Sequence, residues 1–456
     1  MAKKNKVITP NYFIGGYKNQ YKHDKILHVG DLSKEAFLGY GSYINNHRHM
    51  CNILDGMKDS YRRLVWASLQ VPESKKDETT ESLVASVARW HPHGTSSLEL
   101  TAANFVRCGV FSGKGNFGMT SITGTVLPPA AGRYTKCGLS PEWRDLIGEL
   151  VKEVPMVESP KGPLEPEYIP LPLPLSLFLP EQVMGIGVGI RSVYPNFSAK
   201  SLYEAYINDN PMLLKPSIDI NLDYKKSELE KIWRTGKGNV IYYYTIKRQK
   251  SPDGKTEGIL FSGDTGLFTP DIKPFQKLAD EGKVFIEDLT DINGTKLFIG
   301  RIPSARITID EIEKLAQKVC WNKSSCNVEI NVTNGTAAFR IPLRDWIDVT
   351  YKNYISLVDK VRYKRIDKTL FDISVLEALP IIANYLINEN PKASNKEIME
   401  ATGYPQEVIS EVMSKPLSYL RSNKDNTARI ATLKKRVKEL KSLDPVKYTE
   451  ELISKL

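Results

Sequence analysis

Arg133 and Tyr134 are the residues of this chain best suited to chemistry at phosphorus, and they lie within PAAGRYTKC, residues 129 to 137. A free phenol, with a pKa of about 10, is protonated at neutral pH and needs cationic help to attack a phosphate. The adjacent guanidinium could stabilise both the phenolate and the charge of a five-coordinate transition state. The Ala-Ala-Gly stretch before the pair would let a large ligand approach closely. The dipeptide alone leaves a purely structural role open.

Further cationic and imidazole side chains precede this pair. Lys58, Arg62 and Arg63 lie at the start of an amphipathic stretch, where arginine forks could clamp phosphate oxygens, although a solvated helix end is the simpler alternative. His91 and His93 belong to a helix-breaking HPHG turn. We interpret it as a turn whose imidazoles donate to phosphate, with a structural turn as the alternative. No cysteine or carboxylate at ligand spacing accompanies the histidines, so no metal site is predicted.

The stretch GKGNFG, residues 113 to 118, matches the spacing of a dinucleotide-binding loop. That function requires a strand before the glycines and a helix after them. The residues that follow, MTSITGTVLPP, cannot form a helix. We therefore predict a glycine turn at a β-wing, from which Lys114 and Asn116 contact a DNA backbone.

The elements that must position these residues are short helices followed by a β-wing. Apolar spacing predicts helices over residues 60 to 69, 78 to 90 and 95 to 106, the last with Thr95 as its N-cap. Helices followed by a glycine-rich wing are typical of a winged helix-turn-helix, which can lay a helix in a major groove. Residues 1 to 35, rich in Lys, Tyr and Gly, are predicted to form an irregular arm.

The second half of the chain changes character twice. A proline-rich stretch, residues 159 to 181, predicts an extended connector. An α+β region follows, with a helix over 309 to 320 and with strands over 239–246, 258–263, 283–289, 296–302 and 326–332. The last region carries two heptad-like apolar series, which predict an antiparallel helical arm with a small globule. The two series are Ile347, Tyr351, Tyr354, Val358 and Val361, and Ile430, Leu433, Val437 and Leu440.

Composition narrows the class of protein. The 456 residues suggest two to four domains, and a net charge of +10 with a pI of about 9.0 favours an anionic partner. Five cysteines without a CxxC pair argue against a disulfide framework and favour the cytoplasm. The N-terminus lacks a secretory h-region, and apolar runs broken by Pro or Gly predict no membrane segment.

Several motifs in order resemble one family. The series YGSYINNHRHMCNILDGMKDSYRRLVWASL, ARWHPHGTSSLE, GKGNFG, AAGRYTK, MGIGVG and RTGKGNV resembles the breakage-reunion subunit of type IIA DNA topoisomerases. Within that family the chain looks most like the medium subunit of a tailed-phage enzyme, because no β-propeller extension follows. The resemblance covers nearly the whole chain.

The resemblance assigns roles to individual residues. Tyr134 would form a 5′-phosphotyrosyl ester, and Arg133 would stabilise its transition state. Ile186, in MGIGVG, would wedge between base pairs and bend the DNA. The remaining positions would line the scissile phosphate (Arg48, His91, His93), contact the DNA backbone (Lys58, Arg62, Arg63) or match the site of cleavage-stabilising drugs (Ser96, Glu99).

The chain also departs from the family pattern. Asp59 replaces the usual proline after Lys58, Thr95 replaces an aspartate after HPHG, and Lys136 replaces the acidic residue that often follows Arg-Tyr-Thr. These changes put the drug response in doubt. They leave the tyrosine and its arginine intact.

The resemblance implies a multidomain α+β fold. It comprises an arm (1–35), a winged-helix DNA breakage-reunion domain (36–158), an α/β tower or shoulder domain (159–345), and a coiled coil (346–456) with a C-gate dimerisation globule around 385–425. No P-loop is present in the sequence, so ATP and Mg²⁺ are expected on an ATPase/TOPRIM-bearing partner subunit, with none in this chain. The expected partners are double-stranded DNA, a second copy of the chain and that subunit.

Two other functions remain open from the sequence. A winged-helix architectural protein with a coiled-coil dimer would bind DNA without chemistry, and its binding would dissolve in high salt. An RNA-binding or membrane-surface scaffold is a weaker alternative, since Tyr242, Tyr243 and Tyr244 form the only aromatic cluster that suits base stacking.

Overall fold

The computed structural model shows a mixed α+β protein, which confirms the predicted fold class at that level. The chain divides into two compact units, Met1–Tyr354 with Leu452–Leu456, and Ile355–Glu451. The domain boundaries predicted within the first unit stay predictions. The structure describes residues 29–72, 78–120, 126–179, 183–217, 220–223, 226–263, 272–290, 295–320, 324–416 and 426–456.

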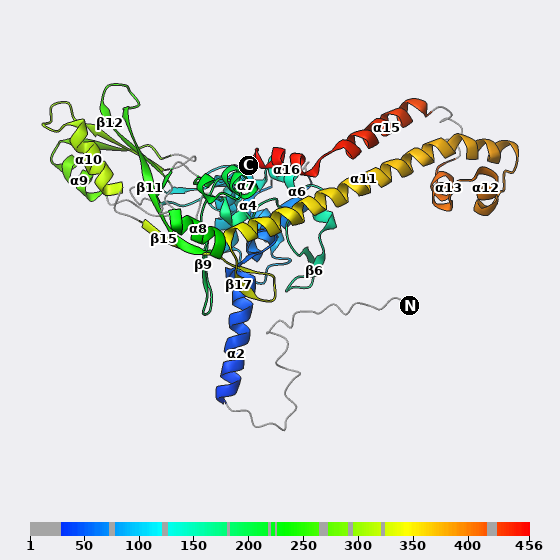
Figure 1. The fold of residues 1–456 in the computed structure, drawn as a ribbon, viewed down its shortest axis with the longest axis horizontal. Helices are drawn as coiled ribbons and strands as arrows, with labels where there is room; N and C mark the ends of the chain where they lie inside the picture. Colours follow the sequence, from blue (N-terminus) through cyan, green and yellow to red (C-terminus); the bar gives the residue numbers. More distant parts are fainter. Residues whose placement is uncertain are drawn as a thin grey trace. The chain divides into compact units, whose positions relative to one another are not determined.

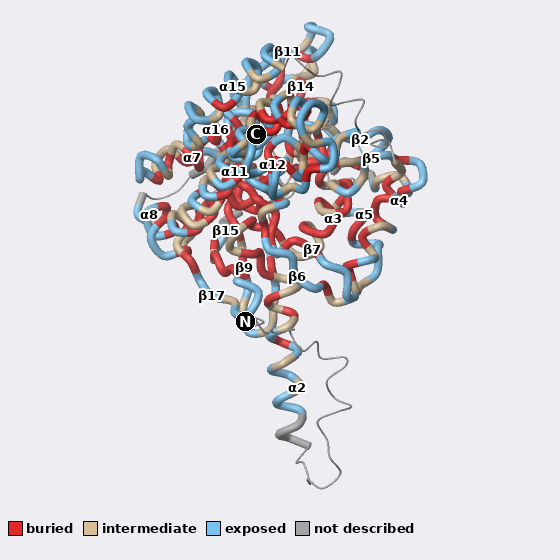
Figure 2. The backbone as a smooth tube through the Cα atoms, turned by 90° about the vertical axis from the view of Figure 1, so that its right-hand side faces the viewer, coloured by how far each residue is buried: buried red, intermediate tan, exposed pale blue. Residues whose placement is uncertain are grey.

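The first unit begins with five helical elements, of which the last three lie close to the helices predicted over 60–69, 78–90 and 95–106 (Figure 1). They are α2 (Val29–Ile44), the π-helical η1 (Asn45–His49), α3 (Asp59–Gln70), α4 (Thr80–Val87) and α5 (Ser96–Arg107). Helix α2 starts at Val29, so the irregular arm predicted up to residue 35 is wrong over its last seven positions, and the rest of that arm lies outside the described residues. Figure 2 shows much of α2 exposed. Thr95 occupies the N-cap position of α5, but its side chain makes no capping hydrogen bond.

Short antiparallel ribbons follow these helices, in the order predicted for the wing. Strand β2 (Phe111–Lys114) pairs with β5 (Lys136–Leu139), and β3 (Met119–Thr120) pairs with β4 (Val126–Leu127). Phe105 of α5 meets Phe111 of β2 edge to face at 5.3 Å between ring centres, which fastens the helices to the ribbon. Residues 121–125 of the predicted wing lie outside the description.

The proline-rich stretch lies in the core and does not connect separate compact units. Strands β6 (Met156–Glu158) and β7 (Leu164–Pro166) form a hairpin, and the 3-10 turn η5 (Leu175–Leu177) follows. Every second residue from Leu171 to Leu179 is a buried leucine. The Leu175 N–H donates to the Asp55 carbonyl at 2.9 Å, so the segment is fastened to the loop before α3. The prolines keep the backbone extended, and the leucines between them bury it.

A twisted sheet of eight described strands carries the rest of the first unit. Its order is β13-β14-β12-β11-β15-β9-β8, and β10 pairs with β11. Helices α9 (Lys273–Asp280) and α10 (Ile309–Cys320) cover one part of it, around a core that includes Phe261 and Phe275. The strands are β8 (Met184–Ile186), β9 (Arg191–Val193), β10 (Ile220–Asp223), β11 (Lys237–Lys250), β12 (Glu257–Gly263), β13 (Val284–Asp288), β14 (Thr295–Arg301) and β15 (Ser324–Glu329).

Smaller elements complete this unit. A three-stranded sheet joins β1 (Cys51–Asn52) to β16 (Asn331–Thr333) and β17 (Ala338–Arg340), which ties the loop before α3 to the segment that precedes α11. The remaining helical elements are α6 (Pro141–Ile147), η4 (Leu150–Glu153), α7 (Ala199–Ile207), η6 (Pro211–Leu213) and α8 (Lys226–Thr235).

The second unit is helical throughout its described part. It contains most of α11 (Leu343–Asn388), then α12 (Asn395–Thr402), α13 (Gln406–Met413), α15 (Thr427–Ser442) and most of α16 (Pro445–Ile453). The second apolar series packs as a seam, since Val437 and its neighbours of that series contact Ile366 and Ile373 of α11. The first series divides, because Tyr354 lies in the first unit, where its hydroxyl donates to the Leu146 carbonyl at 2.8 Å.

Helix α11 is long and apolar enough to cross a membrane by length and composition, a test that core helices of soluble proteins also pass. Val375, Leu379 and Ile382 of this helix lie in the hydrophobic core of the second unit together with Ile398 and Ile409. These apolar side chains of α11 therefore pack against α12 and α13.

Candidate functional site

Tyr134 projects from a single 3-10 turn, η3 (Gly132–Tyr134), and its side chain is 70% exposed. The guanidinium carbon of Arg133 lies 4.8 Å from the centre of the Tyr134 ring. The Tyr134 N–H donates to the Ala131 carbonyl at 2.8 Å, which closes the turn. The phenol is thus open to a large partner and already has a cation against its ring.

The N-terminus of α4 holds this turn in place. The Thr80 N–H donates to the Thr135 carbonyl at 2.9 Å, and the Thr135 hydroxyl donates to the Thr80 hydroxyl oxygen at 2.8 Å. A Cβ on Gly132 would lie 3.0 Å from the Glu81 nitrogen, so glycine lets the turn approach the helix without crowding it. Tyr134 therefore stands on a well-supported backbone.

The GKGNFG stretch is the second support of Tyr134. Gly115 has a φ of +116°, and a Cβ there would lie 3.2 Å from the Tyr134 carbonyl oxygen. Asn116 accepts the Ala130 N–H at 2.9 Å through its backbone and the Gly118 N–H at 2.8 Å through its side chain. The glycine turn is present as predicted. The contact of Asn116 with DNA stays a prediction, since the structure gives its side-chain oxygen a role in the turn.

Lys114 and Lys136 lie directly opposite each other on β2 and β5, and both are exposed. Like charges at directly opposed positions repel, so a nearby anion would relieve this pair. The sequence indicated both lysines, Lys114 in the glycine turn and Lys136 in the cluster with Arg133 and Tyr134. Their position opposite each other follows only from the register of β2 on β5.

Arg62 and Arg63 point into the protein, with only 7% and 4% of their surface exposed. Arg62 donates to Asp55 at 2.9 Å and to Asp59 at 3.0 Å. Arg63 forms a two-pronged ion pair with Glu165, at 2.7 and 2.8 Å. The phosphate contacts predicted for both arginines do not fit this arrangement, because carboxylates already occupy the guanidinium forks. Their role here is to brace α3 against the neighbouring segments.

The histidine turn after α4 lies against this buried network. Its backbone is capped by the His91 N–H donating to the Val87 carbonyl at 3.0 Å, and the rings of His91 and His93 meet edge to face at 5.3 Å. Arg63 Nη1 lies 3.4 Å from His91 Nδ1. Burial, followed by the positive charge of Arg63, lowers the pKa of His91 to about 4. His91 is therefore neutral at physiological pH.

Arg48 belongs to the same neighbourhood. It is an exposed residue of η1. Burial is the main cause that lowers the pKa of His93, and the positive charge of Arg48 lowers it further. The structure thus brings Arg48, His91 and His93 within electrostatic range of one another. This arrangement would allow the three residues to bind one anionic group, as the sequence predicts.

Ile186 stands at the tip of the β8–β9 hairpin with 74% of its surface exposed. A Cβ on Gly185 would overlap the carbonyl oxygen of His49, which explains the glycine before it. The side chain of Asn45 clasps the turn, donating to the Val188 carbonyl at 3.0 Å and accepting the Val188 N–H at 2.8 Å. An apolar side chain is thus presented to solvent on a fixed hairpin.

Lys58 supports the same hairpin, since its ammonium donates to the Met184 carbonyl at 2.6 Å. Burial lowers the pKa of Lys58. Ser96 and Glu99 lie in the first turn of α5, where Ser96 is exposed and Glu99 half-buried. Their match to a drug site stays a prediction.

Tyr134 and the histidine group lie at opposite ends of α4. The Tyr134 turn is held at the N-terminus of this eight-residue helix, and His91 follows its C-terminus. At 1.5 Å per residue the helix alone separates them by about 12 Å. Within the described part of a single chain, the two groups are therefore not in contact.

The acidic residues near the site do not form a metal-binding set. Asp55, Asp59 and Glu165 each accept from Arg62 or Arg63. Although burial opposes it, hydrogen bonding by His47 and the charges of both arginines hold the pKa of Asp59 well below its usual range. In the described ranges, no group of three His, Cys, Asp or Glu residues could hold a metal ion.

Comparison with known proteins identifies relatives over most of the chain. The A subunit of DNA topoisomerase 4 from Borreliella burgdorferi is 23% identical over 69% of this chain, and that of DNA gyrase from Buchnera aphidicola is 26% identical over 64%. The A subunit of DNA topoisomerase 4 from Haemophilus influenzae is 25% identical over 87% of the chain. The chain spans 48%, 38% and 56% of these three proteins, respectively.

The sequence profile of one family, the A subunits of DNA gyrase and topoisomerase IV, matches residues 48–455. This range contains both ends of α4, the Tyr134 turn, the Ile186 hairpin and the helices of the second unit. The chain therefore belongs to the DNA gyrase/topoisomerase IV A-subunit family.

Proposed function

We propose that this chain is the DNA-cleaving subunit of an ATP-dependent type IIA topoisomerase, with Tyr134 as its nucleophile. The observation that carries the proposal is an exposed phenol with a guanidinium 4.8 Å from its ring centre, on a turn fastened to α4. Membership of the gyrase/topoisomerase IV A-subunit family supports the same function.

The proposed reaction exchanges one phosphodiester for another. The Tyr134 oxygen attacks a DNA phosphorus, the bond from phosphorus to the 3′ oxygen breaks, and the phenolic proton leaves as the 3′ hydroxyl forms. Arg133 stabilises the phenolate and the charge on the five-coordinate phosphoryl group. The 5′-phosphotyrosyl ester retains the bond energy, so resealing by the reverse reaction requires no external energy.

We assign the DNA contacts to two surfaces of the first unit. Lys114 and Lys136 lie beside Tyr134 and would neutralise backbone phosphates. The group of Arg48, His91 and His93 would bind a phosphate by hydrogen bonds and charge. Ile186, exposed on a rigid hairpin, would insert between base pairs and bend the duplex.

A partner subunit would supply Mg²⁺ and ATP. The carboxylates nearest the histidine group are already paired with Arg62 and Arg63, so they do not fit a metal site in this chain. A metal ion from the partner would stabilise the attacking and leaving oxygens when bound. The reduced thiols of Cys51 and Cys137 fit a cytoplasmic location.

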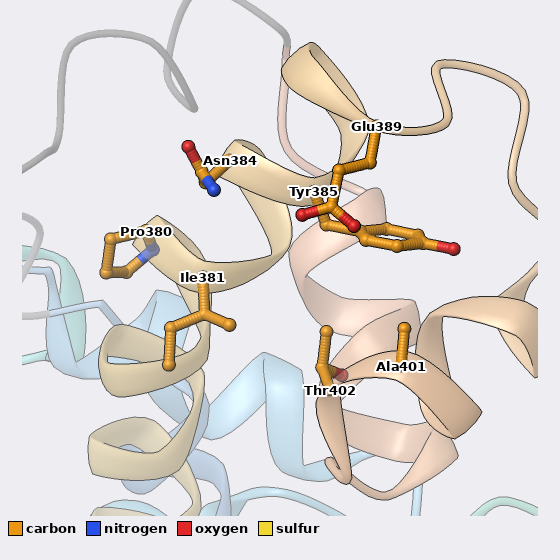
Figure 3. Close-up of a pocket in the computed structure, with 7 residues that line it drawn as sticks. All are labelled: Pro380, Ile381, Asn384, Tyr385, Glu389, Ala401 and Thr402. Atoms are coloured by element: carbon orange, nitrogen blue, oxygen red, sulfur yellow. The ribbon is translucent and has the colours of Figure 1, made fainter.

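A second copy of the chain would form a dimer through the second unit. Ile381, Ile387 and Met399 expose apolar surface on α11 and α12. Figure 3 shows the pocket beside Ile381, which has a volume of about 350 Å³ and lies between α11 and the end of α12. Exposed apolar surface around a hollow is typical of an interface between proteins. We propose that this face is the C-terminal gate.

Detergent-resistant cleavage tests the proposal. The chain is mixed with its ATPase partner, supercoiled DNA and Mg²⁺, and the reaction is quenched with detergent. We expect protein-linked breaks with the wild-type chain and none with Tyr134→Phe, while both bind DNA. Binding that high salt dissolves, with no protein-linked break, would instead indicate an architectural winged-helix protein.

A further inference from the structure

Glu165 and Arg63 form a buried ion pair that joins the β6–β7 hairpin to helix α3. Arg63 Nε lies 2.7 Å from one carboxylate oxygen of Glu165, and Nη2 lies 2.8 Å from the other. A two-pronged pair of this kind fixes the plane of the guanidinium as well as its position. The remaining nitrogen, Nη1, is then directed to His91 Nδ1 at 3.4 Å.

This contact determines which nitrogen of His91 carries the proton. A guanidinium has only donors, so His91 Nδ1 must be the accepting, unprotonated nitrogen. The proton of the neutral ring is then on Nε2, which is left as a hydrogen-bond donor. Asp59 also lies near Arg63, at 3.6 Å from Nη2, but it contacts one nitrogen and cannot fix the plane.

We infer that Glu165 is a positioning residue, which holds the Arg63 fork against His91 and thereby fixes this imidazole as its Nε2–H tautomer. The inference rests on the proposed function for its consequence. In that function, His91 would direct a protonated Nε2, which donates a hydrogen bond, at a DNA phosphate; in the other tautomer Nε2 would be unprotonated and could not donate. Glu165 itself would touch neither DNA nor Tyr134.

The charges around His91 predict how the variant should behave. Arg63 and Asp59 face it from α3, Arg48 from η1, and His93 from its own turn. Without Glu165 to hold it, Arg63 would move away, and the pKa of His91 would rise from about 4 toward its ordinary value of 6.5. If Arg63 stayed in place, loss of a negative charge would lower the pKa of His91 instead.

The sign of this shift is the test. The full-length chain, labelled with ¹³C and ¹⁵N in histidine, is titrated by NMR as wild type, Glu165→Gln and Glu167→Gln. Glu167 is the matched control, because it is an exposed glutamate two residues away. We expect the His91 pKa to rise by more than about one unit only in Glu165→Gln, with mixed tautomers. An unchanged or lowered pKa in that variant would overturn the inference.

A second variant covers the case in which Glu165→Gln does not fold. Arg63→Lys keeps the charge and removes the fork, so we expect a mixture of tautomers with a smaller rise in the pKa of His91. A His91 ring that stays in the Nε2–H form in Arg63→Lys would contradict the inference. In the presence of DNA and the partner subunit, Glu165→Gln should lower cleavage about tenfold relative to Glu167→Gln. Adducts that persist in Tyr134→Phe would reject the proposed function and leave the titration result unaffected.

Discussion

The guanidinium of Arg133 lies against the ring of Tyr134, and we propose that it stabilises the charge that develops during attack on phosphate. We therefore expect Arg133→Gln to lower the rate of DNA cleavage on the order of a hundredfold, because a preorganised cationic donor is lost from the transition state. The affinity for DNA should fall by no more than the loss of a single phosphate contact would cause. Single-turnover cleavage and binding are measured side by side, with Lys152→Gln, an exposed lysine of η4, as the charge-matched control. An equal loss in both variants would contradict the assignment.

His91 makes stability depend on pH. Its pKa is about 4 in the folded chain and 6.5 when unfolded, so the unfolded chain binds more protons between these values. The free energy of unfolding should therefore fall as pH drops from about 7 to about 4.5, with His91 contributing at most about 3 kcal/mol. Asp59 titrates below this window. Urea unfolding of wild type and His91→Gln checks this, and an equal pH dependence in both would contradict it.

At the level of single residues, the sequence indicated only part of the arrangement. Arg48, His91 and His93 lie within electrostatic range of one another, whereas Tyr134 lies at the other end of α4. Arg62 and Arg63 are buried in ion pairs with Asp55 and Glu165. Glu165 is 102 residues away from Arg63 in the sequence, so the sequence does not show that the two side chains meet. Nothing in the local pattern of Arg62-Arg63 distinguishes a phosphate clamp from a buried ion pair. The pairing of Lys136 with Lys114 needed the strand register, which only the fold supplies.

Helix α11 carries Pro380 in its interior, and this residue has a consequence for stability. Proline lacks an N–H, so the Leu376 carbonyl one turn earlier loses its helical partner. The Asn426 side chain donates to that carbonyl at 3.3 Å, just before α15 begins. Asn426 thus fastens the helix pair where the hydrogen-bond ladder of α11 is broken.

A double-mutant cycle tests this coupling. Asn426→Ala should lower the free energy of unfolding by about 1 kcal/mol, because a carbonyl is left without a partner. In a Pro380→Ala background the helix restores its own hydrogen bond, so the same change should cost much less. Urea unfolding of the four variants gives the coupling energy. If Asn426→Ala lowers the free energy of unfolding equally in both backgrounds, its effect does not come from the hydrogen bond to the Leu376 carbonyl.

Regular elements followed from the sequence where local signals agreed. Helix α10 has the predicted bounds, and β11 and β12 contain or overlap the strands predicted over 239–246 and 258–263. The proline-rich stretch was misjudged because prolines are equally compatible with an exposed connector and a buried extended segment. Its alternating leucines were the signal for burial. The Tyr351 and Tyr354 part of the first heptad series packs in the first unit, because an apolar spacing does not name its partner.

For the whole molecule, the proposed reaction requires two copies of the chain. We expect a dimer in solution that weakens at least about tenfold in Ile381→Glu, since a charge would be placed in an apolar interface. Leu370→Glu is the control, because it introduces the same charge at another exposed apolar position of α11. Sedimentation equilibrium measures both dissociation constants. A monomeric wild type, or equal weakening by both changes, would contradict a gate at this face.

The most direct test of the proposed chemistry is to identify the residue that carries DNA in the cleaved complex. The holoenzyme is trapped with detergent on DNA whose internal phosphates are labelled. The complex is digested with nuclease and protease, and the nucleotide-bearing peptide is sequenced by mass spectrometry. We predict one modified peptide, containing Arg133 and Tyr134, with the phosphate on the Tyr134 oxygen. A nucleotide on any other residue, or a label retained in Tyr134→Phe, would contradict the assignment of Tyr134 as the nucleophile.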